Sequence, residues 1–103
     1  MTESDPAVRC YTLTEILFRT QPIRILKLDC EGAEKPILDA TEDLSQVQVL
    51  CGEVHYHMAV PGEDPPDDDW LERTRVRLGF NALMIQHVPR AADIIGLFWM
   101  VRE

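Results

Sequence analysis

The stretch that decides the fold is Ile23-Arg24-Ile25-Leu26-Lys27-Leu28-Asp29-Cys30-Glu31-Gly32-Ala33-Glu34. Residues 23–30 carry apolar side chains on both alternating faces, which is typical of a strand covered on both sides within a parallel sheet. A helix is expected to follow such a strand. Ligands of open parallel sheets bind outside the carboxyl ends of the strands. This stretch therefore predicts a ligand site where the strand ends, near Asp29 and Glu31.

Three carboxylates crowd the turn after this strand, and they belong to Asp29, Glu31 and Glu34. Their mutual repulsion is unfavourable unless backbone N–H groups, a cation or a ligand offsets it. Asp29 either caps the following helix or contacts a ligand. Glu31 lies close to the expected ligand crevice, whereas a structural role at the start of the helix is expected for Glu34.

The elements around this stretch follow from local patterns. Thr12 and Glu15 form a capping-box pattern that starts a short helix, and an extended piece is expected before it at residues 8–11. The spacing of Ala33, Ile37, Ala40 and Leu44 predicts one helix face that lies against the sheet. Alternation predicts a second strand at Val47 to His55, followed by a long loop over residues 56–66.

The last third of the chain is punctuated more clearly. Asp67 opens a helix and Gly79 closes it. Two strands, 80–88 and 94–102, are joined by residues 89–93, which predicts an antiparallel hairpin. The buried stripe expected for the helix is Trp70, Leu71, Thr74 and Leu78.

Composition limits the classes of function. The 103 residues, 46% apolar and 27% charged, fit a single α/β domain over 1–103 with a loose N-terminal tail at 1–7. A formal charge of −8 disfavours binding to nucleic acid or to an anionic membrane. Three widely spaced cysteines without a C-x-x-C pair suit free thiols in the cytoplasm. The longest apolar run, 94–101, is far shorter than the ~20 residues of a membrane helix.

Three motifs in the right order resemble the FkbM family of S-adenosylmethionine-dependent methyltransferases. They are Y-T-L-T-E at 11–15, L-K-L-D-C-E-G-A-E at 26–34, and the strand at 50–55 that ends in G-E-V-H. The family pattern has Asp where this chain has Thr14. The resemblance implies a partial Rossmann-like sheet in which 23–30 corresponds to the fourth strand, 47–55 to the fifth and the hairpin to the last two. It also implies S-adenosylmethionine as cofactor and O-methylation of a small molecule or sugar.

The first three strands of the family fold, which bind the cofactor, have no counterpart in this chain. The five glycines are isolated, so no G-x-G turn is present for close approach to a cofactor. The resemblance thus implies a truncated domain that is inactive alone. The strand at 23–30 would have an open edge, so we expect it to pair with a second copy or with a separate N-terminal half.

The candidate site combines the ends of the two predicted strands. Glu53 and His55 share one face of the second strand and lie near Asp29 if the strands are parallel neighbours. We expect His55 to remove the proton of the acceptor hydroxyl, oriented by Glu53 or Asp29. The resemblance implies that Asp29 contacts the cofactor, and Glu31 is a second candidate.

Two other functions fit the same residues. Asp29, Glu53 and His55, with His57, could bind a divalent metal, although an ordinary hydrogen-bonded histidine is favoured over that hypothesis. The chain could also be a non-catalytic interaction module that pairs through its open sheet edge.

Overall fold

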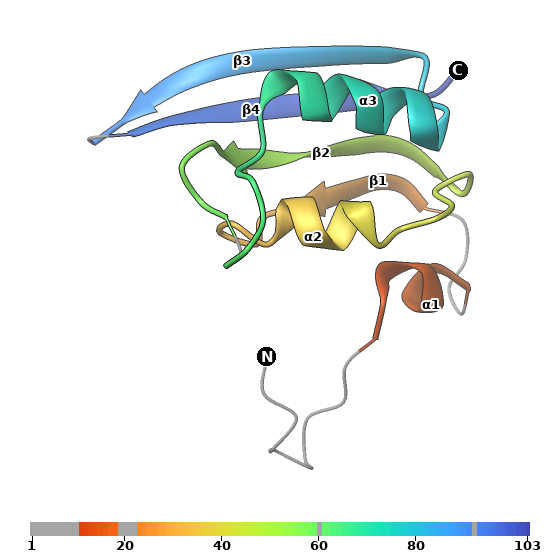
Figure 1. The fold of residues 1–103 in the computed structure, drawn as a ribbon. Coiled ribbons are helices and arrows are strands. Elements are labelled where there is room, and N and C mark those ends of the chain that lie inside the picture. The colour runs from red at the N-terminus through yellow and green to blue at the C-terminus, as the bar shows by residue number, and fades with distance from the viewer. Residues whose placement is uncertain (1–10, 19–22, 60, 92) are drawn as a thin grey trace.

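The computed structural model describes residues 11–18, 23–59, 61–91 and 93–103. The expected tail at 1–7 and most of the extended piece at 8–11 lie outside these residues. Three helices alternate with strands along the chain (Figure 1), and the order is α1 (Leu13–Phe18), β1 (Ile23–Leu28), α2 (Glu34–Asp39), β2 (Val47–His55), α3 (Asp68–Leu78), β3 (Ala82–Arg90) and β4 (Asp93–Val101).

The four strands form one mixed sheet in the order β1-β2-β4-β3. β1 and β2 are parallel, with Leu28 opposite Gly52. β4 lies between β2 and β3 and is antiparallel to both. The predicted parallel pair and the predicted C-terminal hairpin are therefore confirmed, and β1 lies at an edge of the sheet.

Helices α2 and α3 cover one face of this sheet (Figure 1). The core lies beneath them, where Leu50, Val54, Phe98 and Met100 of the sheet are fully buried. Within the described residues no helix covers the opposite face, on which Ile25 is 63% exposed and Trp99 is 37% exposed. The expectation that β1 is covered on both faces was wrong for this reason.

Helix α2 presents a different face from the predicted one. It ends at Asp39, and Glu34 and Leu38 are its buried residues. Of the predicted face, Leu44 is buried but lies beyond the helix, and Ala40 is exposed. The carboxylate of Glu34 folds into the preceding turn and fixes which side of the helix faces inward. Arg77 of α3 donates to the carbonyl oxygens of Leu38 and Thr41 at 2.8 and 2.7 Å, which satisfies the end of α2.

Helix α3 forms as predicted. The Asp67 carboxylate accepts a 2.7 Å hydrogen bond from the Trp70 N–H at its start, and Gly79 ends it with a φ of 79°. At this φ a residue without Cβ is favoured. The four residues of the predicted stripe are all buried, namely Trp70, Leu71, Thr74 and Leu78.

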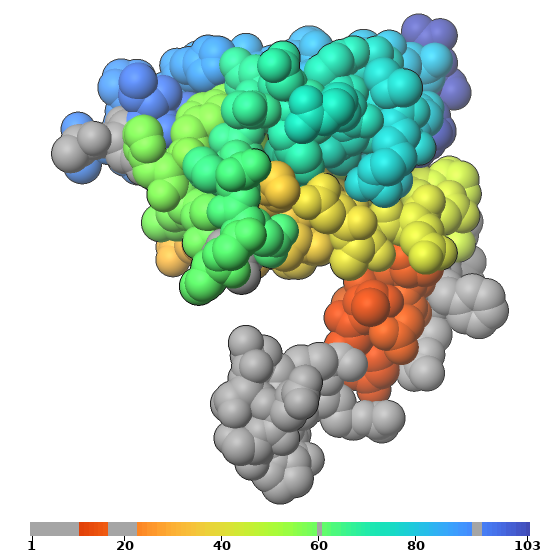
Figure 2. Space-filling view, viewed as in Figure 1, coloured from red at the N-terminus to blue at the C-terminus, as the bar shows by residue number. Residues whose placement is uncertain are grey.

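The hairpin turn is tighter than predicted, because β3 continues to Arg90 and pairs there with Asp93 of β4. Pro89 is accommodated since β3 is an edge strand, where a missing backbone N–H is tolerated. At the other end of the chain, the predicted capping box of α1 is confirmed by reciprocal bonds between Thr12 and Glu15. Helix α1 projects from the body beside α2 (Figure 2).

No helix in the described part of the chain is both long enough and apolar enough to cross a membrane.

Candidate functional site

The carboxyl ends of β1 and β2 lie side by side, because the two strands are parallel and paired up to Leu28 and Gly52. The chain leaves β1 through a turn in which Glu31 has a φ of 47° and Gly32 a φ of 102°. The chain leaves β2 at His55, which is buried. Polar groups from the turns after β1 and β2 therefore meet at the carboxyl-terminal end of these two strands.

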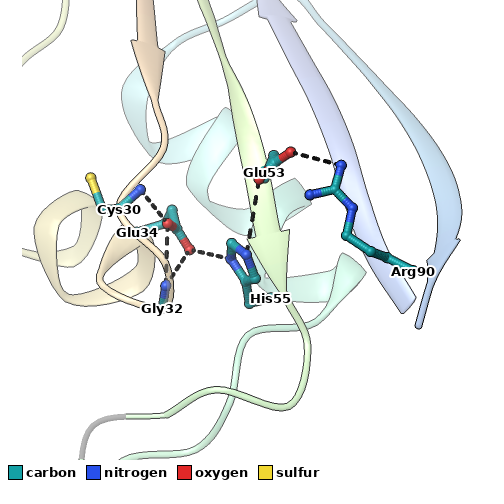
Figure 3. Close-up of polar contacts among 6 residues, drawn as sticks. All are labelled: Cys30, Gly32, Glu34, Glu53, His55 and Arg90. Atoms are coloured by element: carbon teal, nitrogen blue, oxygen red, sulfur yellow. Dashed lines mark hydrogen bonds and ion pairs between the residues drawn. The ribbon is translucent and has the colours of Figure 1, made fainter. Parts of the chain in front are cut away.

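The central group at this end of the strands is the carboxylate of Glu34, whose exposure is only 1%. It folds back over the turn and accepts hydrogen bonds from the N–H of Cys30 at 2.8 Å and of Gly32 at 3.2 Å (Figure 3). Its Oε1 also lies 3.3 Å from Nδ1 of His55. These donors offset the cost of burying a carboxylate.

His55 lies between two carboxylates. Its side chain is 11% exposed, and its Nε2 lies 3.9 Å from Oε2 of Glu53. Oε1 of Glu53 is in turn 3.7 Å from the guanidinium of Arg90 (Figure 3). Both of these distances exceed hydrogen-bond length, so these contacts are electrostatic only. Among the residues that the structure describes, none lies within hydrogen-bond distance of Nε2 of His55.

The structure brings together only some of the residues predicted for the site. Glu53 and His55 are neighbours, as the alternation of β2 requires. Asp29 and Glu31 are both exposed in the turn after β1, and among the described residues no hydrogen bond or ion pair joins either of them to Glu53 or His55. The helix N-cap is Ala33, so Asp29 does not have the capping role considered for it. The catalytic and cofactor-binding roles of these residues stay predictions.

Sequence reasoning missed Glu34 as the nearest partner of His55. The two residues are 21 positions apart, and the spacing of neither strand points to the contact. The one available signal is local, since a carboxylate two residues after Gly32 can reach the free N–H groups of that turn.

Burial and charge shift the ionisation of two further groups nearby. Burial raises the pKa of the Cys30 thiol, and the Glu34 carboxylate adds to the effect. Burial also raises the pKa of Tyr56, whose hydroxyl donates a 2.6 Å bond to Asp68. Asp68 also lies 2.8 Å from His87, so it links the end of β2 to β3.

A cleft of about 510 Å³ opens between the turns that follow β1 and β2. It is lined by the turn after β1, residues 31–33, and by the turn after β2, residues 57–59. Among the described residues no group of three or more His, Cys, Asp or Glu side chains is arranged to hold a metal ion. The geometry therefore gives no support to the metal-binding hypothesis.

The family model of the methyltransferase FkbM domain matches residues 2–81. The chain belongs to this family. The match contains β1, β2 and all the residues of the candidate site except Arg90, and it confirms the family predicted from the three motifs. The mixed four-stranded sheet with its helices is compatible with part of a methyltransferase fold. Searches of curated proteins and of solved structures gave no significant match.

FkbM methyltransferases typically use S-adenosylmethionine, and close approach of the backbone to such a cofactor requires glycines with free space around them. A Cβ on Gly52 would lie 2.2 Å from the carbonyl oxygen of Leu28, and one on Gly96 would lie 2.2 Å from the hydroxyl of Tyr56. A Cβ on Gly32 would lie 2.9 Å from Met58. These glycines make room for the chain itself. The described residues therefore do not fit the whole cofactor, although the cleft between the two turns is open to part of one.

Proposed function

We propose that this FkbM-domain chain supplies the acceptor-binding part of an S-adenosylmethionine-dependent methyltransferase that methylates a hydroxyl group of a small molecule or sugar. Membership of the family supports methyl transfer in general. The observation that carries the more specific proposal is His55, which Glu34 holds at the carboxyl end of β2 and whose Nε2 has no described residue within hydrogen-bond distance.

In this proposal His55 is the general base. A hydroxyl oxygen becomes a better nucleophile as its proton is removed, and an imidazole can accept that proton near neutral pH. Glu53, 3.9 Å from Nε2, would stabilise the imidazolium that forms. Asp29 and Glu31 are the proposed contacts to the cofactor, because both are exposed where the chain leaves β1.

We further propose that the chain needs a complementing segment for full activity. Two features support this view: the described glycines form no cradle for the cofactor, and no described strand pairs with the outer edge of β1. In this assignment β1 and β2 correspond to the fourth and fifth strands of the family sheet. A second copy or a separate N-terminal half would supply the missing contacts. The cytoplasm suits the free thiols of Cys30 and Cys51.

Calorimetric titration with S-adenosylhomocysteine at millimolar concentration tests the cofactor assignment. We expect saturable heat, and we expect Asp29→Asn to weaken binding several-fold because it removes one of the proposed contacts. Asp43→Asn is the matched control, since Asp43 is exposed near the amino end of β2. No heat from the wild-type chain would contradict cofactor binding by the chain and favour the second function below.

The second candidate function is an interaction module without catalytic activity. Its specific support is that β1 is an edge strand whose outer face is exposed, with Ile25 at 63%. Exposed apolar edge strands readily pair with another chain.

Light scattering after size-exclusion chromatography tests this function. The module predicts a mass above that of one chain, and Ile25→Lys should restore the monomer because a charged side chain blocks edge pairing. Val76→Lys is the matched control, since Val76 is 62% exposed on α3. Elution of the wild-type chain as a monomer would argue against association through this edge.

A further inference from the structure

We propose that Glu34 is a positioning residue that holds His55 in one tautomer, with the proton on Nδ1, and fastens it to the turn after β1. This inference rests on the proposed function in one respect only, namely that His55 acts as the base. The geometry itself is independent of cofactor and acceptor.

Backbone N–H donors surround the carboxylate of Glu34. Oε2 of Glu34 accepts from the N–H of Cys30 at 2.8 Å, and both oxygens lie within 3.3 Å of the N–H of Gly32. Both backbone donors are fixed by the turn, in which Gly32 has a φ of 102°. The carboxylate therefore has a single orientation, and it presents Oε1 to the ring of His55.

The orientation of this carboxylate decides which ring nitrogen of His55 carries the proton. An ionised carboxylate can only accept hydrogen bonds, so Nδ1 of His55, 3.3 Å from Oε1, must carry a hydrogen. In the neutral ring the other nitrogen, Nε2, then has a free lone pair. Nε2 is also the nitrogen for which the described part of the chain provides no hydrogen-bond partner, because Glu53 is 3.9 Å away. A proton taken from an acceptor hydroxyl would be bound at Nε2, and the resulting positive charge would lie between the two carboxylates.

Replacing the carboxylate by an amide of the same shape would turn one of its two acceptor atoms into a donor. In Glu34→Gln the amide oxygen is favoured at the position of Oε2, because it keeps the 2.8 Å bond from the N–H of Cys30 there. The N–H of Gly32 then loses its 3.2 Å contact to Oε1 and keeps the 3.3 Å contact to Oε2. The amide NH₂ is then placed toward Nδ1 of His55. Because an NH₂ group donates, it favours a lone pair on Nδ1 and moves the ring proton to Nε2. The substitution should therefore reverse the tautomer with little change in shape.

Long-range ¹H–¹⁵N NMR of the uniformly labelled chain, recorded where the ring is neutral, tests the proposal. We expect the Nδ1 of His55 to show the shift of a protonated nitrogen and Nε2 that of an unprotonated one. Glu34→Gln should exchange the two shifts. Glu53→Gln is the matched control and should leave them unchanged, since Glu53 is beyond hydrogen-bond length. His55→Asn assigns the signals.

Two results would overturn the proposal: a wild-type ring with its proton on Nε2, or the same tautomer in wild type and in folded Glu34→Gln. If Glu34→Gln does not fold, the wild-type spectrum still decides the tautomer. A purely structural role for Glu34 would change the stability without exchanging the nitrogen shifts. The measurement uses no cofactor, so the expected tautomer together with no binding of S-adenosylhomocysteine would reject the proposed function and leave the positioning role intact.

Discussion

Glu34 illustrates how a buried charge can be tolerated in a chain that carries a formal charge of −8. Its carboxylate is surrounded by two backbone N–H groups and the ring of His55, so burial does not leave it unsatisfied. The same contacts join the exits of β1 and β2. One side chain thus stabilises the turn and orients the candidate base.

Tyr56 is a second residue whose environment can be tested, because burial and the nearby Asp68 raise the pKa of its hydroxyl. A raised pKa means that the folded state favours the protonated form. The resulting stabilisation is complete below the ordinary value of 10.0 and is lost as the pH rises above it. We expect the free energy of unfolding to fall more steeply above about pH 10 in wild type than in Tyr56→Phe.

Urea unfolding of wild type and Tyr56→Phe at several pH values measures this difference. At neutral pH the variant should be less stable by about 1 kcal/mol, because the 2.6 Å bond to Asp68 is lost. A difference between the two proteins that stays constant from neutral to alkaline pH would contradict the assigned environment.

At the scale of elements, the sequence predicts best where the signals are local. Asp67, Gly79 and the buried stripe of α3 lie within a few residues of one another, and the whole helix was predicted correctly. The inward face of α2 was predicted wrongly, because it depends on the bonds of Glu34 to the turn. The contact between Glu34 and His55 joins residues 21 positions apart and depends on the pairing of two strands. No local pattern carries that information.

Removal of the α3 N-cap tests how much the Asp67 side chain stabilises this helix. Asp67→Ala loses the acceptor of the Trp70 N–H and should lower the free energy of unfolding by about 1 kcal/mol. Asp67→Asn keeps a side-chain oxygen and should lower the free energy of unfolding by only a few tenths of a kcal/mol, since asparagine caps nearly as well. Chemical denaturation measures both values, and equal losses in the two variants would show that the cap bond is unimportant.

The described part of the molecule is asymmetric, because α2 and α3 lie on one face of the sheet (Figure 1). Ile25 and Trp99 are exposed on the other face. The sequence predicted the strands and the open edge of β1, but it also predicted, wrongly, that both faces of β1 are covered. An apolar strand pattern does not reveal whether the cover comes from the same chain. The exposed face and edge are therefore the surfaces on which the proposed complementing segment would bind.

Arg102 holds distant parts of the molecule together. Its guanidinium donates to the carbonyl oxygens of Leu44, Val47, Leu78 and Gly79 at distances from 2.9 to 3.2 Å. It also lies 4.4 Å from the centre of the Phe80 ring. We expect Arg102→Ala to lower the free energy of unfolding by about 2–3 kcal/mol, because bonds from a charged donor are lost.

Arg102→Lys should recover little of this loss, since an ammonium group cannot reach four carbonyls as a planar guanidinium does. Arg73→Ala is the control, because Arg73 is exposed on α3 and its loss should change the stability by less than about 0.5 kcal/mol. Urea unfolding of the three variants gives the comparison. A fully stable Arg102→Ala protein would disprove the role of Arg102 as a link between elements.

We propose that His55 is the base of a methyltransferase site. The most direct test of this role is transfer of a labelled methyl group from millimolar S-adenosylmethionine to a mixture of sugars and small hydroxyl compounds. We expect His55→Gln to slow transfer by at least about 100-fold, the usual contribution of a general base, and His87→Gln to leave the rate unchanged. Transfer by His55→Gln at the wild-type rate would contradict this role of His55.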